Sequence, residues 1–422
     1  MAVVGYGVEG TSAVKYWQAA GYEVTVCDQN PALQLSAGVG SQLGDNYLGG
    51  LDQFDIVVRT QSIRPDRLVG ARQITSTTKE FFARCPAVII GVTGSKGKGT
   101  TATLIAKLLE AGGHKVWLAG NIGKSPLDFL GDVQRDDLVV LELSSFQLMD
   151  LDQSPQIAVC LMIVPEHMNW HPSMEEYLAA KSNIFKHQAE DDLAIYNKTN
   201  PYSTQLGEQS LGHHRPYLDP EGAYVKEDYI WYRDQQIMPV SQIGLIGPHN
   251  QQNICAAVTA IWDLVPVREA IMKTIRDFNG LEHRIEPVRE VGGVRYYDDS
   301  FSTTPETAIA AIRSFQEPKV LILGGSSKDS NYDEMAEVIA GANIAKAILI
   351  GATAPAIQAA LDQKGFKNYL AGPTQMTEIV KMAHDNAPAG GVVLLSPGCA
   401  SYDMFKNYKD RGEQFKAAVN AL

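Results

Sequence analysis

Short apolar runs rich in Val and Ile alternate with stretches of helical spacing along almost the whole chain. Short β-branched runs are typical of strands, and strands that alternate with helices form parallel sheets. The pattern therefore predicts an α/β fold with mostly parallel sheets. Predicted strands open the chain at AVVGYG and follow at 23–28, 87–92, 115–119, 138–143, 157–164, 193–197, 294–300, 319–325, 346–351 and 391–398, and predicted helices lie at 11–20, at 100–111 and after Ser401.

The order of these segments predicts three domains, over residues 1–82, 83–285 and 286–422. A length of 422 residues fits three domains at about 150 residues each. Residues 200–245 are rich in polar and turn residues with short β-like pieces, which predicts a small antiparallel sheet inside the second domain.

Composition narrows the class of protein. The longest apolar run, 157–164, has eight residues, far below the roughly 20 that span a bilayer. The first residues show no charged segment followed by an apolar one, so we expect no secretory signal, and five scattered cysteines without a CxxC pair favour a reducing cytoplasm. A net charge of −12 argues against binding to a nucleic-acid backbone. We expect a cytoplasmic protein, in which local basic sites can still bind small phosphates.

A first glycine turn, Gly5-Tyr-Gly-Val-Glu-Gly10, follows the first strand and precedes a helix, and Asp28 ends the second strand. Such a turn lets a pyrophosphate approach the free N–H groups of a helix N-terminus. The motif is equally compatible with NAD, with a UDP-sugar and with a tight turn that binds nothing. An NAD-dependent dehydrogenase would depend on this motif alone.

A second glycine turn, TGSKGKGTT at 93–101, lies between a buried-type strand and a helix. Its backbone N–H groups can surround phosphate oxygens, and Lys98 can neutralise their charge. Val92 and Gly99 depart from the usual nucleotide-binding loop, so the hydroxyl for Mg²⁺ would come from Thr100 or from elsewhere in the chain. A flexible loop without ligand is the alternative.

Two further side chains follow strands of the same sheet. Glu142 ends the strand 138–143, and His167 follows the strand 157–164. Ligands bind at the carboxyl ends of parallel strands, so both side chains should face the second glycine turn, where a carboxylate suits Mg²⁺. Lys181 lies on a predicted helix just after His167, and composition alone indicates a surface lysine.

Taken together, the motifs resemble the Mur ligases, in order and over nearly the whole chain. The similar segments are TGSKGKGTT (93–101), GNIG (120–123), LELSSFQL (141–148), EHMNWHPSMEEYLAAK (166–181), GPHNQQN (247–253), GLEHRIE (280–286), DDSFSTTPE (298–306), LGGSSK (323–328) and the block 394–415. The resemblance implies a Rossmann-like UDP-binding domain, a central P-loop-type ATPase domain with a mostly parallel sheet, and a Rossmann-like C-terminal domain that brings the amino acid. It also implies closure of the domains, with 282–300 as the hinge region.

Within the family, LELSSFQL, GLEHR and the last block are most similar to the members that attach D-glutamate. The implied reaction passes the γ-phosphoryl group of ATP to the alanine carboxylate of UDP-MurNAc-L-Ala. The amine of D-glutamate then attacks the acyl phosphate, and phosphate leaves. ATP and two Mg²⁺ ions are the implied cofactors.

The resemblance implies roles residue by residue. Lys98, Glu142, His167 and Lys181 are implied to be catalytic, with Lys181 carbamylated so that it offers Mg²⁺ an anionic oxygen. The implied ATP-binding residues are Gly94, Ser95, Lys96, Gly97, Lys98, Gly99, Thr100, Thr101, Asn250, Asn253, Arg284 and Asp299. The implied UDP-substrate residues are Gly7, Val8, Glu9, Asp28, Asn121, Ser144 and His167; those for D-glutamate are Thr303, Lys328, Ser401 and Tyr408; those for metal are Thr100, Glu142, His167 and Lys181.

The chain also departs from the family pattern. Phe301 stands where many relatives carry a lysine, and Thr-Gln-Ser-Ile at 60–63 replaces Ser-Pro-Gly-Ile. The KGKG spacing resembles folylpolyglutamate synthase, a relative without the N-terminal domain. A glutamate ligase of that type, a Mur ligase of other amino-acid specificity, and a nucleotide-binding module without catalysis are the alternatives.

Overall fold

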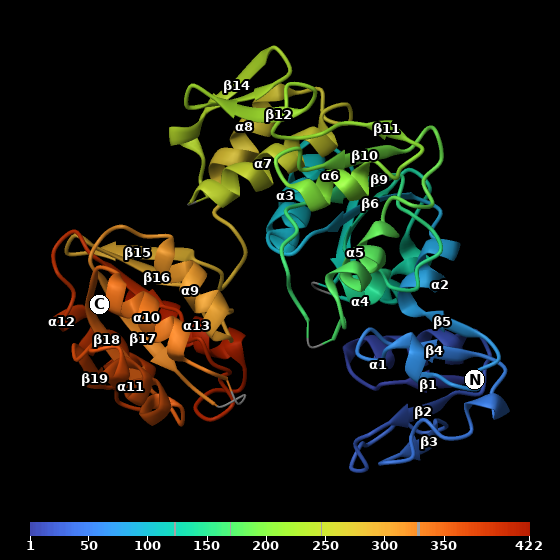
Figure 1. The fold of residues 1–422 in the computed structure, drawn as a ribbon, viewed down its shortest axis with the longest axis horizontal. Helices are drawn as coiled ribbons and strands as arrows, with labels where there is room; N and C mark the ends of the chain where they lie inside the picture. Colours follow the sequence, from blue (N-terminus) through green and yellow to red (C-terminus); the bar gives the residue numbers. More distant parts are fainter. Residues whose placement is uncertain (122–123, 169, 246, 327–329) are drawn as a thin grey trace. The chain divides into compact units, whose positions relative to one another are not determined.

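The computed structural model describes residues 1–121, 124–168, 170–245, 247–326 and 330–422. The chain forms two compact units (Figure 1). One comprises Met1–Ile243 with Pro248–Phe278, and the other comprises Gly244–Gly247 with Asn279–Leu422. The first unit contains the sheets of both the first and the second predicted domain, and its break from the second unit falls at Phe278, before the predicted boundary at 285. The three-domain division stays a prediction.

The N-terminal sheet has five parallel strands in the order β3-β2-β1-β4-β5. This order reverses between β1 and β4, and the carboxyl ends of those strands form the crevice where such sheets bind ligands. The sequence predicted β1 and β2 but not the short strands β3 to β5. The elements are β1 (Ala2–Val4), α1 (Val8–Ala19), β2 (Thr25–Asp28), β3 (Gly40–Leu43), β4 (Val57–Arg59), β5 (Ile74–Ser76) and α2 (Thr77–Arg84).

The central sheet has six parallel strands in the order β11-β10-β9-β6-β8-β7. The strand predicted over 157–164 ends at Cys160, because the backbone beyond it bonds to the second glycine turn: Ser95 N–H donates to Met162 O over 2.9 Å. The strands are β6 (Val88–Thr93), β7 (Val116–Gly120), β8 (Leu138–Glu142), β9 (Ile157–Cys160), β10 (Leu193–Tyr196) and β11 (His213–His214). The helices are α3 (Lys98–Ala111), α4 (Ser145–Leu148), α5 (Met174–Ser182), α6 (Pro201–Gly207), α7 (Pro248–Ile261) and α8 (Arg268–Asp277).

A separate antiparallel sheet lies within the same unit. It consists of β12 (Ala223–Lys226), β13 (Tyr229–Tyr232) and β14 (Gln235–Pro239), paired in that order. The predicted antiparallel sheet within 200–245 is therefore confirmed.

The second unit is built on a mixed sheet of six strands in the order β15-β16-β20-β17-β18-β19, in which only β15 is antiparallel to its neighbour. The strands are β15 (Glu286–Val291), β16 (Val294–Asp298), β17 (Lys319–Gly324), β18 (Ile344–Ile350), β19 (Tyr369–Ala371) and β20 (Val392–Leu395). The helices are α9 (Pro305–Arg313), α10 (Asp333–Gly341), α11 (Ala354–Gln363), α12 (Met376–Asp385) and α13 (Tyr408–Asn420).

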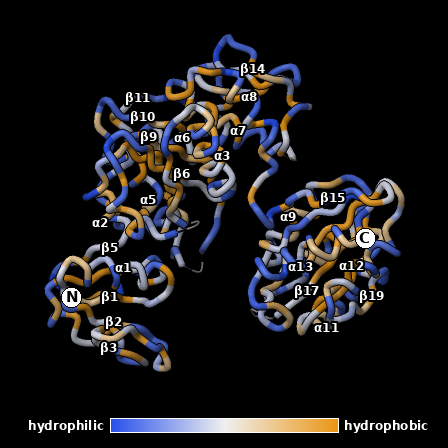
Figure 2. The backbone as a smooth tube through the Cα atoms, turned by 180° about the vertical axis from the view of Figure 1, so that it is seen from behind, coloured by the Kyte–Doolittle hydropathy of each residue, from blue (hydrophilic) through white to orange (hydrophobic). Residues whose placement is uncertain are grey.

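Buried apolar side chains cover both faces of this sheet. Along β17, Leu321 and Leu323 belong to one apolar cluster, whereas Val320 and Ile322 belong to another. Successive residues of a strand point to opposite faces, so a continuous apolar strand is buried on both. Figure 2 shows the same apolar character along the inner strands of each unit. The α/β fold with parallel sheets is therefore confirmed.

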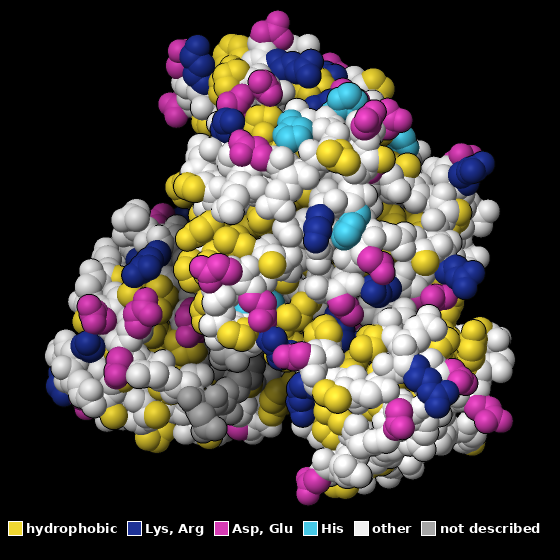
Figure 3. Space-filling view, turned by 45° about the vertical axis from the view of Figure 1, so that its right-hand side comes forward, with side chains coloured by type: hydrophobic (Ala, Val, Ile, Leu, Met, Phe, Trp, Pro, Cys, Tyr) yellow, Lys and Arg dark blue, Asp and Glu magenta, His cyan; other side chains and the backbone are white. Residues whose placement is uncertain are grey.

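The surface is mixed in character. Acidic and basic side chains are interspersed over the face that Figure 3 shows, as the composition of 36 Lys and Arg against 48 Asp and Glu leads one to expect. In the described part of the chain, no helix combines the length and the apolar character needed to cross a membrane.

Candidate active site

The second glycine turn connects β6 to α3 and requires glycine at two positions. Gly97 has φ +88°, and a Cβ there would lie 2.3 Å from Oδ1 of Asn253. Gly94 has φ +147°, and a Cβ there would lie 2.7 Å from the Cβ of Leu161. No other residue tolerates both the backbone conformation and these close approaches. The turn therefore presents bare backbone N–H groups ahead of α3, an arrangement that suits phosphate.

Three side chains of this turn have different surroundings. The Lys98 ammonium donates to Gly94 O over 3.1 Å and to Ser95 O over 2.9 Å, so its charge lies over the loop backbone. The buried Ser95 hydroxyl donates to Val164 O over 2.8 Å. Lys96 is exposed and lies 2.6 Å from Oε1 of Glu166. Ser95 thus fixes the loop through its side chain, and Lys98 supplies its positive charge.

Glu142, at the end of β8, carries an unsatisfied buried oxygen. The residue is 4% exposed. Its Oε1 accepts from Nδ2 of Asn121 over 3.0 Å, whereas Oε2 has no hydrogen-bond partner within the described structure. An unpaired buried carboxylate oxygen is costly unless a cation binds it. The donor set therefore fits Mg²⁺, which prefers oxygen ligands.

Two threonine hydroxyl groups stand at the end of the second glycine turn, at the start of α3. Thr100 and Thr101 are both buried in the first turn of the helix. Among described groups, the Thr101 hydroxyl has no hydrogen-bond partner. The Thr101 hydroxyl is therefore buried without a described partner at the start of α3.

Lys181 lies on α5 and contacts the glycine turn. It is 1% exposed, and its ammonium donates to Gly94 O over 2.8 Å and to the Thr93 hydroxyl over 3.1 Å. Burial lowers the pKa of Lys181 to about 7, and the charge of Lys98 lowers it further in the same direction. The expectation of a surface lysine is therefore wrong, because α5 packs this residue against the turn.

His167 stands at a strained backbone position beside the same turn. Its φ is +59°, and its ring lies 4.9 Å from the ring of Phe146. Partial burial lowers the pKa of His167, and the charges of Lys98 and Lys181 act in the same direction, against Glu166. The lowered pKa favours the neutral imidazole, which has a lone pair for a metal or a donor.

Glu142, His167 and Lys181 therefore gather around the second glycine turn. Both Lys98 and Lys181 act electrostatically on His167, and Glu142 acts on Lys181. The two asparagines of α7 join them: Asn253 lies against Gly97 and donates to Oδ1 of Asn250 over 2.9 Å.

The first glycine turn is closely packed on one side and open on the other. A Cβ at Gly5 would lie 2.3 Å from Oγ1 of Thr60, and a Cβ at Gly10 would lie 2.0 Å from Gly5 O. Gly7 has open space beside it, and Val8 is 76% exposed. The glycines therefore serve the turn itself, and Gly7 and Val8 present its free side.

The acidic candidates of this domain already accept hydrogen bonds. Oδ2 of Asp28 accepts from Tyr6 N–H over 2.7 Å. The Glu9 carboxylate accepts from Gln61 N–H over 2.8 Å and from the Thr77 hydroxyl over 2.7 Å. Both carboxylates thus fix the shape of the crevice.

Ser144 connects this domain to the central sheet. Its hydroxyl lies 3.2 Å from Oε1 of Gln61 and caps α4 together with Gln147. Asn121 is held beside Glu142 by its own backbone N–H, which donates to Glu142 O over 2.9 Å.

In the second unit, Asp299 and Arg284 lie close together. Asp299 is buried, its Oδ2 accepts from the Ser396 hydroxyl over 2.6 Å, and its Oδ1 accepts from Ile285 N–H over 3.2 Å. Burial raises the pKa of Asp299 to about 7, although these hydrogen bonds and the charge of Arg284 act to lower it. The Arg284 guanidinium lies 5.2 Å from the ring centre of Phe301.

The D-glutamate candidates are only partly described. Tyr408 packs edge-on against Phe301 at 5.1 Å, so one ring separates it from Arg284. Ser401 is buried, and its carbonyl accepts from Phe405 N–H over 2.8 Å. Thr303 is half-buried. Lys328 lies outside the described residues.

Sequence reasoning missed two buried groups of the second unit. Nδ1 of His283 lies 2.7 Å from Oδ2 of Asp298, and Glu286 accepts from the backbone N–H of His283, so these three could hold a metal. Arg411 is fully buried and donates to Ser300 O over 2.8 Å. His283 and Arg411 stand inside the motifs GLEHR and 394–415, which was the available signal.

Two family models match the chain: the Mur ligase middle domain over residues 92–261, and the Mur ligase glutamate ligase domain over 283–399. The chain is also 38% identical to the UDP-N-acetylmuramoylalanine–D-glutamate ligase of Acetivibrio thermocellus, over 100% of this chain and 96% of that protein. The chain belongs to the Mur ligase family. The middle-domain match spans the second glycine turn, Glu142, His167, Lys181 and Asn253.

Other Mur ligases agree in sequence or fold. The UDP-N-acetylmuramoylalanine–D-glutamate ligase of Clostridium kluyveri is 37% identical over 100% of this chain and 96% of its own length. The structure of the UDP-N-acetylmuramate-alanine ligase MurC from Thermotoga maritima covers 100% of this chain and 99% of its own, with a TM-score of 0.62 at 14% identity. MurF of Thermotoga maritima, solved with ADP, covers 99% and 94% with a TM-score of 0.59 at 17% identity. These structures share the fold.

Proposed function

We propose that this Mur ligase joins D-glutamate to UDP-N-acetylmuramoyl-L-alanine at the expense of ATP. The observation that carries the proposal is the similarity, over the full chain, to ligases named for that reaction. The geometry agrees with it, since Lys98, Glu142, His167 and Lys181 gather around a glycine turn of the kind that binds phosphate.

The proposed chemistry has two steps. A carboxylate oxygen of the substrate alanine attacks the γ-phosphorus of ATP, a P–O bond forms, and ADP leaves with the electron pair of the broken P–O bond. The amine of D-glutamate then attacks the carbonyl carbon, phosphate leaves, and the nitrogen loses a proton. Lys98 and the N–H groups of the turn would stabilise charge on the transferring group and hold it in line.

Glu142, His167 and Thr100 are the side chains that we propose for Mg²⁺, with Lys181 as a further ligand after carbamylation. A bound Mg²⁺ would offset the negative charge of the triphosphate. The unpaired Oε2 of Glu142 and the neutral ring of His167 support this assignment. We propose two ions for the loaded enzyme.

Carbamylation of Lys181 needs a neutral amine. The nitrogen lone pair forms a bond to the carbon of CO₂, one C=O electron pair moves to oxygen, and the nitrogen releases a proton. Lys181 is buried, and burial lowers its pKa to about 7, so a large fraction of the amine is neutral at physiological pH. The product carries an anionic oxygen in place of an ammonium, which reverses its interaction with Mg²⁺.

The two substrates would bind to different domains. We propose the first glycine turn with Gly7, Val8 and Asn121 for the UDP-linked substrate, and Thr303, Ser401 and Tyr408 for D-glutamate. Arg284 and Asp299 are proposed for the nucleotide. Because the reaction uses ATP and a nucleotide-linked precursor, we propose that it takes place in the cytoplasm, and that the chain acts as a monomer.

An amino-acid screen tests the proposal. The protein is incubated with ATP, Mg²⁺ and UDP-MurNAc-L-Ala plus one amino acid at a time, and products are identified by mass spectrometry. We expect ADP and an adduct only with D-glutamate. An adduct with another amino acid would assign a different Mur ligase specificity, and turnover with folate plus L-glutamate would assign the folylpolyglutamate type.

A further inference from the structure

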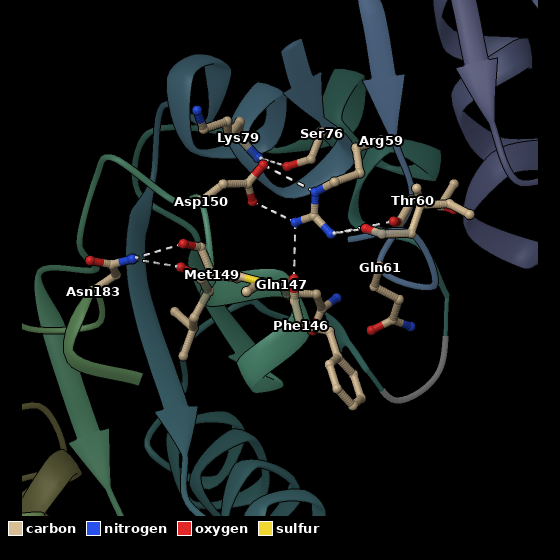
Figure 4. Close-up of polar contacts among 12 residues, drawn as sticks. Arg59, Thr60, Gln61, Ser76, Lys79, Phe146, Gln147, Met149, Asp150 and Asn183 are labelled. Atoms are coloured by element: carbon tan, nitrogen blue, oxygen red, sulfur yellow. Dashed lines mark hydrogen bonds and ion pairs between the residues drawn. The ribbon is translucent and has the colours of Figure 1, made fainter. Parts of the chain in front are cut away.

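Arg59 is a buried arginine whose donors are all used (Figure 4). It ends β4, is 1% exposed, and forms two bonds to the Asp150 carboxylate, from Nε over 3.1 Å and from Nη2 over 2.5 Å. Nη2 also donates to Phe146 O over 2.9 Å, and Nη1 donates to Ile63 O over 3.0 Å and to Thr60 O over 3.4 Å. A lysine could not reproduce this planar set of contacts.

On one side, Arg59 binds residues 60–63, which pack against the first glycine turn. The hydroxyl of Thr60 donates to Val4 O over 2.8 Å, and Gly5 is a glycine because a Cβ would collide with that hydroxyl. Gln61 N–H donates to Oε2 of Glu9 over 2.8 Å. The position of residues 60–63 therefore sets the shape of the crevice at the carboxyl ends of β1 and β4.

On the other side, Arg59 holds the segment that follows Glu142. Phe146 lies on α4 and Asp150 just beyond it, and β8 ends at Glu142. The ring of Phe146 lies 4.9 Å from the ring of His167. One guanidinium thus binds both the wall of the first glycine turn and the element between Glu142 and His167.

A second arginine fixes the far end of the same segment. Nη1 of Arg64 donates to Oε1 of Glu176 over 2.9 Å and also to Trp170 O. Oε1 of Glu176 lies 3.3 Å from Nδ1 of His171, whose Nε2 lies 2.9 Å from the Ser145 hydroxyl. Residues 59–64 are therefore held at both ends. Arg59 binds the segment of α4, and Arg64 binds the segment that follows His167.

We propose that Arg59 is a positioning residue for phosphoryl transfer: it sets the place of the first glycine turn relative to Glu142 and His167. The inference rests on the proposed function, in which the turn holds the UDP end of the substrate and Glu142 and His167 lie at its reacting end. A substrate held at two places reacts slowly when the places shift, since about 1 Å of misplacement costs about 100-fold in rate.

The test compares Arg59→Met, which removes the charge and the donors, with Arg72→Met. Arg72 belongs to the same domain, and its one ion pair among the described residues is an exposed pair with Asp55 at 3.9 Å. At a temperature where both variants are folded by circular dichroism, Arg59→Met should lower kcat by about 10- to 100-fold. Its Kd for a non-hydrolysable ATP analogue should stay within about threefold of the wild-type value. Arg72→Met should change neither quantity.

A second readout does not depend on turnover. In hydrogen–deuterium exchange, Arg59→Met should speed exchange in peptides covering 60–63 and 143–150, but not in α3. Unchanged exchange in those peptides, or a lower melting temperature with wild-type kcat, would overturn the proposal. If Arg59→Met does not fold, Asp150→Asn replaces it with the same expected outcomes. Wild-type protein without turnover would refute the proposed function and, with it, the role of Arg59 in phosphoryl transfer, and faster exchange in Arg59→Met would then show only that Arg59 fixes residues 60–63 to residues 143–150.

Discussion

The ammonium of Lys181 donates to the carbonyl oxygen of Gly94 over 2.8 Å. A lysine from α5 is thereby buried directly beneath the turn that the sequence assigns to phosphate. Desolvation and the neighbouring Lys98 both disfavour its charged form. This contact joins α5 to the second glycine turn. The first prediction tests what Lys181 contributes there.

Lys181→Ala should reduce ligation by at least about 100-fold, because the alanine can offer no oxygen ligand in this position. Short carboxylic acids such as formate or acetate should restore part of the activity by filling the vacated space. The measurement is ADP release with increasing carboxylate. Lys186→Ala is the matched control, since Lys186 is exposed just beyond α5. Absence of rescue in a folded variant would contradict the carbamate role.

Lys98→Ala should lower kcat by about 100- to 1,000-fold, because it removes the cation that lies over the glycine turn. Single-turnover phosphate release measures the effect. Lys107→Ala is the control, because Lys107 is exposed on the same helix. It should leave kcat unchanged if the effect belongs to Lys98 and not to any lysine of α3. Near-wild-type turnover in Lys98→Ala would show that the turn does not hold the transferring phosphate.

Glu142→Gln should raise the Mg²⁺ concentration for half-maximal turnover by at least about tenfold. Without Mg²⁺ the variant should be as stable as the wild type or more so, because the buried, unpaired Oε2 of Glu142 loses its charge. The melting temperature of the wild type should rise with added Mg²⁺, and that of the variant should not. Equal responses to Mg²⁺ would exclude Glu142 as a ligand.

Asp299 should make stability depend on pH. Burial raises its pKa from 3.8 to about 7, so the folded chain retains a proton that the unfolded chain releases. The stability due to this proton is fully present below about pH 4 and is lost as the pH rises through 7. Between these limits, the free energy of unfolding of the wild type should fall relative to Asp299→Asn by about 2 to 4 kcal/mol.

Urea unfolding at pH 5, 6, 7 and 8 measures this difference. Asp385→Asn is the control, since Asp385 is exposed at the end of α12. Parallel pH profiles for the wild type and Asp299→Asn would mean that Asp299 titrates normally in the folded chain.

Local sequence signals located the second glycine turn, α3 and the end of β8 that carries Glu142, and they placed His167 beyond β9. These features depend on short-range patterns: a β-branched strand, glycines at left-handed positions, and an apolar helix face. The burial of Lys181 could not be predicted in this way, because α5 meets β6 only through the tertiary fold. Its sequence EEYLAAK is compatible with an exposed helix.

The elements that were missed are short or polar. β15 reads EPVREV and is an edge strand, so its charged residues meet solvent and hide the strand pattern. Arg59 follows the apolar residues of β4, where a charged residue would ordinarily mark a solvated strand end. Its contacts with Phe146 and Asp150, 87 and 91 positions away, show that it is buried.

Gly97 lies so close to Asn253 of α7 that a side chain at position 97 would collide with it. The two residues are far apart in the sequence, so this contact forms only when the chain folds. The conformation of the turn is thereby imposed before a nucleotide arrives. A triphosphate that binds here loses little free energy to the ordering of the loop. More of its binding free energy is therefore left to orient the reacting oxygen.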